Sequence, residues 1–258
     1  MIAWMPFLLI FLLASCRFNH SPYEVGSLDL SQNEVSLRRI QDQERGSSDD
    51  FKIAFIADTH NYYSDLDDLI ERINERGPYR FVMVAGDITN LGLFEEYKQT
   101  RRYLNKLNFP YLVAVGNHDL LSNGKKVYQR FFGSRDFTLS YKDAEFIIFD
   151  NNNWESGGAV PNAVFVEAKL MASTAPHKIL VAHVSPTDAD RFTDSEINQW
   201  KDLMDRYQVS YFMHGHNHSP AEFNWGNTKL ITIGAPSKRS YVELIFSNGE
   251  VTHQKITF

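Results

Sequence analysis

Five short apolar runs constrain the fold of this chain more than any other feature of its sequence. Their residues are apolar at consecutive positions and not at alternate ones, which predicts strands that are buried on both faces. The runs are Ile53 to Ala57, Phe81 to Ala85, Tyr111 to Val115, Ile179 to Ala182 and Tyr211 to Met213. Strands of this kind belong to sheets that helices cover, so the sequence predicts the α/β fold class.

Segments with helical periodicity separate these runs. We expect apolar helix faces formed by Leu66, Leu69, Ile70 and Ile73, by Tyr97, Leu104 and Leu107, and by Ile197, Trp200, Leu203, Met204 and Tyr207. Thr193 and Glu196 have the spacing of a capping box, which predicts that the third helix begins there. Two β-type runs, 230–233 and 241–246, follow Lys229 and predict antiparallel strands that complete a sheet.

The length and composition of the chain suit one large domain. Apolar residues make up 43% of the 258 residues, which is enough to bury a sizeable core. We expect the domain to cover residues 51–258, after a polar linker over 17–50 in which a short helix can form. The net charge of −6 and the lack of a long Lys or Arg run argue against a nucleic-acid polymer as partner. A small phosphorylated substrate stays open, because bound metal ions would reverse the local field.

The first 16 residues have the pattern of an export signal. Their apolar run, Ile2 to Ala14, is shorter than the roughly 20 residues that span a bilayer as a helix. The segment Leu13-Ala14-Ser15-Cys16 resembles the lipobox of bacterial lipoproteins, in which the cysteine becomes the lipidated N-terminus. The resemblance implies an exported protein, in the periplasm or anchored to the membrane through Cys16. A plain cleaved signal peptide and a buried thiol are the alternatives.

Each of the five apolar runs ends in a cluster of metal-capable side chains. The clusters are Asp58-Thr59-His60, Gly86-Asp87, Gly116-Asn117-His118-Asp119, His183 and His214-Gly215-His216-Asn217-His218. Ligands of open α/β sheets bind beyond the carboxyl ends of the strands, so we expect the five clusters to meet at one site. Their mixture of carboxylate, imidazole and amide oxygen suits Mn²⁺, Fe or Zn²⁺ better than Ca²⁺.

In order and spacing, these clusters resemble the signature of the calcineurin-like metallophosphoesterase family: D-x-H, G-D, G-N-H-D, a lone His and G-H-x-H. The resemblance covers residues 53–218 and implies a four-layer α-β-β-α sandwich of two mixed β-sheets flanked by helices. Within it, the segment Gly92 to Asn117 is similar to bacterial cyclic-nucleotide phosphodiesterases of the family. We therefore expect the family's fold and its metal-dependent hydrolysis.

The same resemblance implies a role for each matching residue, at a site that binds two divalent metal ions. Asp58, His60 and His218 would hold one ion, Asn117, His183 and His216 the other, and Asp87 would bridge the two. His118 would protonate the leaving oxygen as general acid, and Asp119 would accept a hydrogen bond from the other ring nitrogen of His118. His214 lies outside the signature, and we expect it to pack behind the ligands.

A paired-cation site of this kind predicts hydrolysis of phosphoester bonds. Two ions roughly 3.5–4 Å apart bind phosphoryl oxygens and lower the pKa of a bridging water, which then attacks phosphorus as hydroxide. The substrate can be a phosphodiester or a phosphomonoester. Two alternatives stay open: cleavage of a nucleotide pyrophosphate, and a non-catalytic metal-binding scaffold of the same fold. His118 argues against the scaffold, because a scaffold has no need of a general acid.

Overall fold

The computed structural model describes residues 21–27, 29–44, 49–157 and 163–258. The predicted export signal and Cys16 lie outside these residues, so export and lipidation stay predictions. Among the helices of the described ranges, none combines the length and the apolar composition that a bilayer crossing requires.

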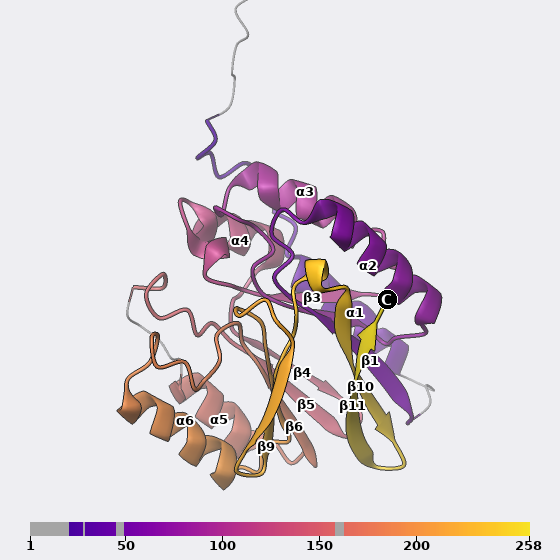
Figure 1. Cartoon of the computed structure of the whole chain (residues 1–258), viewed down its shortest axis with the longest axis vertical. Helices are drawn as coiled ribbons and strands as arrows, with labels where there is room; N and C mark the ends of the chain where they lie inside the picture. Colours follow the sequence, from indigo (N-terminus) through magenta and orange to yellow (C-terminus); the bar gives the residue numbers. More distant parts are fainter. Residues whose placement is uncertain (1–20, 28, 45–48, 158–162) are drawn as a thin grey trace, which may run out of the picture.

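Two mixed β-sheets lie face to face at the centre of the molecule (Figure 1). The first sheet has the order β11-β10-β1-β2-β3, with β1 (Phe51–Ile56), β2 (Val82–Ala85), β3 (Tyr111–Ala114), β10 (Ser240–Ser247) and β11 (Glu250–Thr257). The second has the order β4-β5-β6-β7-β9-β8, with β4 (Phe137–Tyr141), β5 (Ala144–Ile148), β6 (His177–Val181), β7 (Tyr211–His214), β8 (Ala221–Trp225) and β9 (Thr228–Thr232). All five predicted strands are present. Strands β1, β2 and β3 run parallel in one sheet, and β6 and β7 run parallel in the other.

Helices cover the outer face of each sheet, which confirms the four-layer sandwich (Figure 1). The first sheet is covered by α2 (Tyr63–Arg76), α3 (Phe94–Leu104) and α4 (Gly124–Phe132), and the second by α5 (Ala163–Ala172) and α6 (Asp194–Arg206). The predicted capping box is formed at the start of α6, where Thr193 and Glu196 bond to each other's backbone N–H groups. A third apolar cluster fills the space between the sheets.

Helix α1 (Gln32–Glu44) corrects the linker predicted over residues 17–50. It packs along β3, the edge strand of the first sheet, and Ile40 is buried in the core between the sheets. The buried Asn33 side chain donates to the carbonyl of Val113 and accepts from its N–H, both at 2.9 Å. Residues 32–44 therefore belong to the domain. The helix is mostly polar, so its composition resembles that of a linker. The amide of Asn33 bonds to both backbone groups of Val113 on the edge strand, as the backbone of a further strand would.

The C-terminal strands do have antiparallel partners, as predicted: β9 pairs with β8, and β10 pairs with β1 and β11. They do not complete one sheet, so that part of the prediction is wrong. Strand β9 pairs in parallel with β7 in the second sheet, whereas β10 pairs antiparallel with β1 in the first. The chain crosses between the sheets after β9, and a run of apolar residues carries no information on which sheet it joins. The predicted turn after β10 does form: Asn248 and Gly249, with φ of 54° and 77°, connect β10 to β11 as a hairpin.

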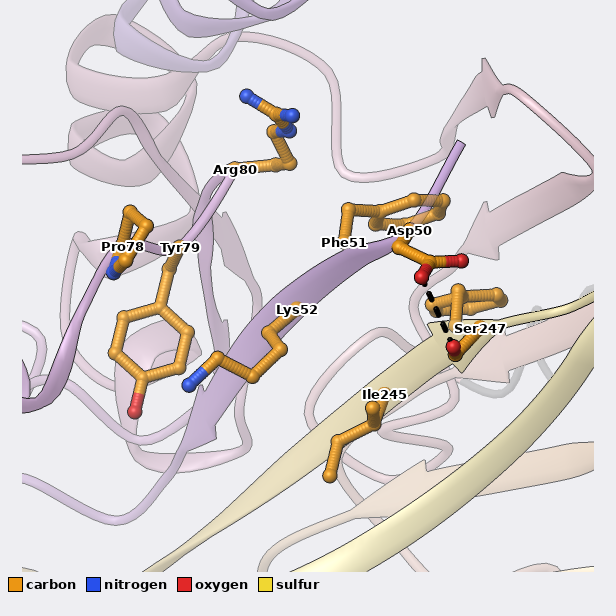
Figure 2. A pocket seen from close by; sticks show the side chains of 9 residues that line it. Asp50, Phe51, Lys52, Pro78, Tyr79, Arg80, Ile245 and Ser247 are labelled. Carbon is orange, nitrogen blue, oxygen red and sulfur yellow. Dashed lines mark hydrogen bonds between the residues drawn. The ribbon is translucent and has the colours of Figure 1, made fainter. Parts of the chain in front are cut away.

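A pocket of about 330 Å³ opens at the amino-terminal end of β1, and Figure 2 shows the side chains that line it. Lys52, Tyr79 and Arg80 contribute to its wall. The predicted site residues follow the carboxyl ends of the strands, and none of them lines this pocket. The chemistry predicted from the sequence therefore lies elsewhere.

Candidate metal centre

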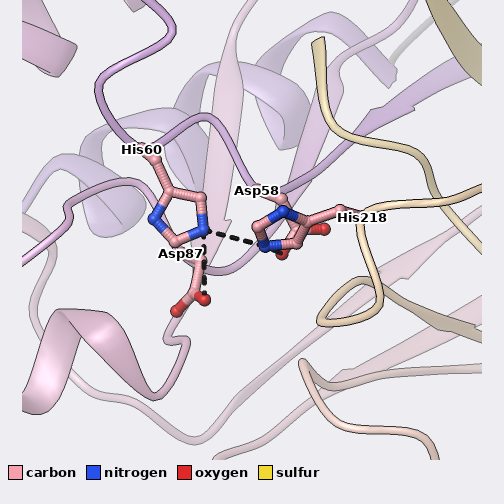
Figure 3. A group of neighbouring side chains, drawn as sticks. All are labelled: Asp58, His60, Asp87 and His218. Carbon is pink, nitrogen blue, oxygen red and sulfur yellow. Dashed lines mark hydrogen bonds and ion pairs between the residues drawn. The ribbon is translucent and has the colours of Figure 1, made fainter. Parts of the chain in front are cut away.

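The predicted ligands follow the carboxyl ends of five strands. Three of them, β1, β2 and the edge strand β3, lie in the first sheet, and two, β6 and β7, lie in the second. Asp58 lies two residues after β1, Asp87 two after β2, and His183 two after β6. Asn117 follows β3, and His216 lies two residues after the end of β7. Because the sheets are stacked, these ends meet, and Figure 3 shows four of the side chains turned toward one another. The sheets thus deliver separate parts of the chain to one point.

A first group of donors consists of Asp58, His60, Asp87 and His218, whose ligand atoms all lie within 4.8 Å of one another (Figure 3). The Nε2 atoms of His60 and His218 are 3.2 Å apart. His60 Nε2 lies 3.5 Å from Asp87 Oδ2, and His218 Nε2 lies 3.7 Å from Asp58 Oδ1. Two imidazoles and two carboxylates therefore surround a space that one cation can occupy.

A second group shares Asp87 with the first. It contains Asp87, His183 and His216, with ligand atoms again within 4.8 Å of one another. His183 Nε2 lies 3.1 Å from Asp87 Oδ2, and the Asn117 Oδ1 lies 3.1 Å from His216 Nδ1. All seven predicted ligands are thus brought together, with Asp87 between the two groups.

Backbone carbonyls set the tautomer of two of these histidines. His60 Nδ1 lies 3.0 Å from the carbonyl of Thr89, and His183 Nδ1 lies 2.8 Å from the carbonyl of Ala85. A carbonyl can only accept, so each Nδ1 carries the proton. In the neutral ring, the Nε2 lone pair then faces the donor group, which is the arrangement typical of metal-binding histidines.

The charges of the centre fit a cation in the same place. The Asp58 Oδ2 atom is buried without a hydrogen-bond partner, and burial raises the pKa of Asp58 to about 7 despite the nearby His183. Burial acts against a charged His183 too, but the carboxylates of Asp87 and Asp58 outweigh it and raise the pKa of His183 to about 9. An unpartnered carboxylate oxygen beside imidazoles is the donor set that a divalent ion satisfies.

Left-handed backbone is concentrated in this centre. Five of the seven predicted ligands have positive φ: Asp58 at 53°, His60 at 38°, Asp87 at 53°, His216 at 73° and His218 at 57°. Such angles are uncommon outside glycine and cost on the order of 1–3 kcal/mol each. Gly116 relieves crowding at the same point, because a Cβ there would lie 2.1 Å from Asp87 Oδ1. The strand exits are strained in the way that functional sites often are.

The structure places His118 beside the first donor group, with its ring edge-on to that of His60 and 4.9 Å away between centroids. The predicted bond between His118 and Asp119 is wrong. His118 Nδ1 donates to the carbonyl of Asn90 at 2.7 Å. Asp119 is fully buried and accepts from the N–H groups of Gly116 and Thr89, each at 2.9 Å. The chain turns here into the short 3₁₀ helix η1 (His118–Leu120), which points consecutive side chains in different directions.

Three residues that were not predicted as site residues support the centre. Thr89 and Asn90 hold His60 and His118 through backbone carbonyls, a role that leaves no signal in residue type. Asn151 accepts from the N–H groups of His183 and Val184 at 3.2 and 3.0 Å and so fixes the end of β6. His214 is buried, its Nε2 lies 3.3 Å from the hydroxyl of Thr232, and burial lowers its pKa to about 4.

Comparison with known proteins identifies the family. The model of the calcineurin-like phosphoesterase family matches residues 51–220. A probable cyclic nucleotide phosphodiesterase of Xenorhabdus bovienii is 23% identical over 198 residues, covering 68% of this chain and 76% of the relative. A glycerophosphodiester phosphodiesterase of Enterobacter lignolyticus is 36% identical over 80 residues, covering 26% of this chain and 29% of the relative.

Solved structures share the fold. A dimetal phosphatase from Danio rerio superposes with a TM-score of 0.61 at 15% identity, covering 81% of this chain and 99% of that one. The purple acid phosphatase of yellow lupin gives 0.60 at 15% identity, covering 82% of this chain and 54% of that one. With the family match over most of the folded part, the chain belongs to the calcineurin-like phosphoesterase family and is a metal-dependent phosphoesterase.

Proposed function

We propose that the chain hydrolyses phosphodiesters with a pair of divalent ions, Mn, Fe or Zn, on either side of Asp87. One observation carries this proposal: two groups of convergent donors have the Asp87 carboxylate in common. Asp58, His60 and His218 would complete one ion site, and Asn117, His183 and His216 the other. When bound, the ions would polarise the phosphoryl oxygens and lower the pKa of a water between them.

His118 is proposed as the general acid. Its Nδ1 donates a hydrogen bond to the carbonyl of Asn90, which fixes the orientation of the ring. Nε2 is therefore the ring atom that can exchange a proton with the substrate. The backbone N–H of His118 also donates to Asp87 Oδ1 at 2.9 Å, which ties the position of this residue to the shared carboxylate. A protonated Nε2 can then donate to the oxygen that leaves phosphorus. Asn90, acting through its carbonyl, takes the orienting part that Asp119 was expected to play.

The relatives favour diesters as the substrate class. Their names describe cyclic nucleotide and glycerophosphodiester phosphodiesterases, which both cleave one of two ester bonds to phosphorus. Nucleotide pyrophosphate cleavage is the rival activity.

We also propose that the chain is exported and anchored through a lipid on Cys16. Cells that express the protein should incorporate radiolabelled palmitate into it, and Cys16→Ser should abolish the label. Equal labelling of both proteins would contradict this proposal.

A substrate panel with defined metals tests the proposed activity. Full-length protein is stripped with a chelator, its residual metal is measured by mass spectrometry, and Mn²⁺, Fe²⁺ or Zn²⁺ is returned. We expect hydrolysis of bis-p-nitrophenyl phosphate to depend on added metal and to exceed that of p-nitrophenyl phosphate. Faster cleavage of a nucleotide diphosphate ester would favour the rival activity. Inactivity toward all three substrates with every metal would favour the scaffold.

A further inference from the structure

The loop that follows β5 carries an exposed tryptophan beside an arginine. Trp154 is 62% exposed, and the guanidinium carbon of Arg191 lies 4.3 Å from the centroid of its ring. In the parts of the chain that the structure describes, Trp200 is buried and Trp225 is partly covered, so Trp154 stands apart. A cation lies over one face of its indole, and most of the residue is exposed to solvent.

The arginine of this pair is held in place independently of the tryptophan. Arg191 Nη1 lies 3.0 Å from both carboxylate oxygens of Glu155. The two side chains of this ion pair are only 11% and 14% exposed. The guanidinium plane is therefore fixed before any ligand arrives, and a ligand that stacks on Trp154 does not have to order it.

Two contacts place the pair next to the metal centre. Trp154 comes three residues after Asn151, whose side chain bonds to the N–H of His183, and three residues span at most about 10 Å. Arg191 comes three residues after Asp188, whose Oδ2 lies 3.9 Å from His216 Nε2. The N–H of Arg191 also donates to the carbonyl of Asp188 at 3.1 Å. The pair thus lies by the second donor group.

We propose that Trp154, backed by Arg191, is a stacking platform for the base of a nucleotide whose phosphate binds at the metal centre. This inference rests on the proposed function and narrows its substrate class to nucleoside phosphodiesters. A neutral, planar base can stack on the open indole face. A choline-type head group fits less well, because the guanidinium already places a cation against the same ring.

The test compares two ligands that differ by the base alone, adenosine 5′-monophosphate and ribose 5-phosphate. Each is measured as an inhibitor of bis-p-nitrophenyl phosphate hydrolysis by the metal-loaded full chain. We expect the inhibition constant of the nucleotide to rise about 5- to 150-fold in Trp154→Ala, the range that loss of one base stacking contact gives. The constant of ribose 5-phosphate should change by less than about twofold, because its phosphate and sugar do not stack.

Two further variants separate stacking from general damage. Trp154→Phe keeps an aromatic face and should restore most of the preference for the nucleotide. Phe223→Ala removes another exposed aromatic side chain, on β8, and should leave both inhibition constants unchanged. Circular dichroism spectra of the variants should match that of the parent protein.

Three results would overturn the platform. Parent protein that binds both ligands equally well would do so, as would equal losses for both ligands in Trp154→Ala. Stronger competition by glycerophosphocholine than by the nucleotide would assign the indole to a cationic head group. If the protein hydrolyses no diester, the proposed function fails. The platform is then tested by the fluorescence of Trp154, which is the part of the signal that Trp154→Phe removes. Quenching by the nucleotide but not by ribose 5-phosphate would support the platform, and no quenching by the nucleotide would overturn it.

Discussion

Two buried carboxylates near strand β1 have opposite surroundings. Glu243, on β10 opposite Ala54, is 1% exposed and accepts from Arg76 Nε at 2.7 Å and from the hydroxyl of Tyr79. The ammonium group of Lys52 lies 3.9 Å away, beside the pocket in Figure 2. Asp58, at the carboxyl end of β1, is 0% exposed, and its Oδ2 has no hydrogen-bond partner.

The difference separates a structural carboxylate from a ligand. Glu243 has its counter-charges in the protein, so folding alone satisfies it. Asp58 has histidines and a second carboxylate around it, so the protein leaves part of its charge to something that binds. A buried charge is tolerated only when it is paired, and at Asp58 a cation is the missing partner.

The largest expected effect comes from Asp87→Asn, which alters the carboxylate that the two donor groups share. Its kcat/KM for bis-p-nitrophenyl phosphate should fall at least about 10⁴-fold. Bound ions lower the pKa of a water from about 15.7 to about 7, and without them hydroxide is scarce at neutral pH. The matched control is Glu243→Gln, whose kcat/KM should change far less, since Glu243 contacts Arg76, Lys52 and Tyr79 and none of the predicted metal ligands. Steady-state kinetics and metal analysis measure both variants. An active Asp87→Asn protein with full metal content would remove Asp87 from the centre.

His118→Ala should give the next largest effect, and one that depends on the leaving group. A diester with an alkoxide leaving group should lose about 10²- to 10³-fold in kcat, since that oxygen needs a proton as it departs. A p-nitrophenyl diester should lose far less, because its leaving oxygen is a weak base. Comparing kcat for the two substrates tests this. Equal losses would deny His118 the role of general acid.

In metal-free protein at pH 8, substitutions of Asp58 and Glu243 should change the free energy of unfolding in opposite directions. Burial raises the folded-state pKa of Asp58 from its ordinary 3.8 to about 7. The stability that the protonated carboxyl contributes is therefore fully present below pH 3.8 and is lost as pH rises through 7, so at pH 8 the folded protein holds a buried charge. Asp58→Asn should therefore raise the free energy of unfolding, by about 1–3 kcal/mol. Glu243→Gln should lower it by a similar amount, about 1–3 kcal/mol, because Arg76 and Lys52 lose their partner.

Urea denaturation in the presence of a chelator measures these changes. With Mn²⁺ added, the parent protein should become more stable than Asp58→Asn, because the ion then binds the carboxylate. If Asp58→Asn destabilises the metal-free protein as much as Glu243→Gln does, the contrast between the two sites is wrong.

The smallest effect is on the pH dependence of metal binding. The carboxylates of Asp87 and Asp58 outweigh burial and raise the pKa of His183 to about 9, so the metal-free ring holds a proton at pH 7 that an ion must displace. The apparent affinity for Mn²⁺ should rise between pH 6 and pH 9, with release of about one proton or more per chain. Calorimetry in two buffers of different ionisation enthalpy counts these protons. Binding without proton release would contradict a protonated His183.

The sequence predicted the parts of this molecule that depend on strand ends. Asp58, Asp87 and His183 each follow a buried apolar run. Parallel pairing of β1 and β2 brings the first two together, and the stacking of the two sheets adds His183, which follows β6. The α/β class followed from the same runs, whereas the two sheets and their helical layers followed from the family resemblance. This information is local, because a strand and the residue after it are adjacent in the chain.

The remaining contacts depend on the tertiary structure. The partner of His118 is a backbone carbonyl 28 residues earlier, and no residue type marks a carbonyl. Helix α1 docks partly through the amide of Asn33, which bonds to β3 from 80 residues away. The division of β9 and β10 between two sheets is equally invisible, because both are apolar runs. Sequence patterns located the donors, whereas the contacts that orient them needed the structure.

Anomalous diffraction from crystals of the full domain grown with Mn²⁺ tests the central claim most directly. We predict two manganese peaks about 3.5–4 Å apart, one on each side of the Asp87 carboxylate, with Asp58 Oδ2 bound to one of them. A single peak, or none beside Asp87, would contradict the account of two donor groups joined by one shared carboxylate.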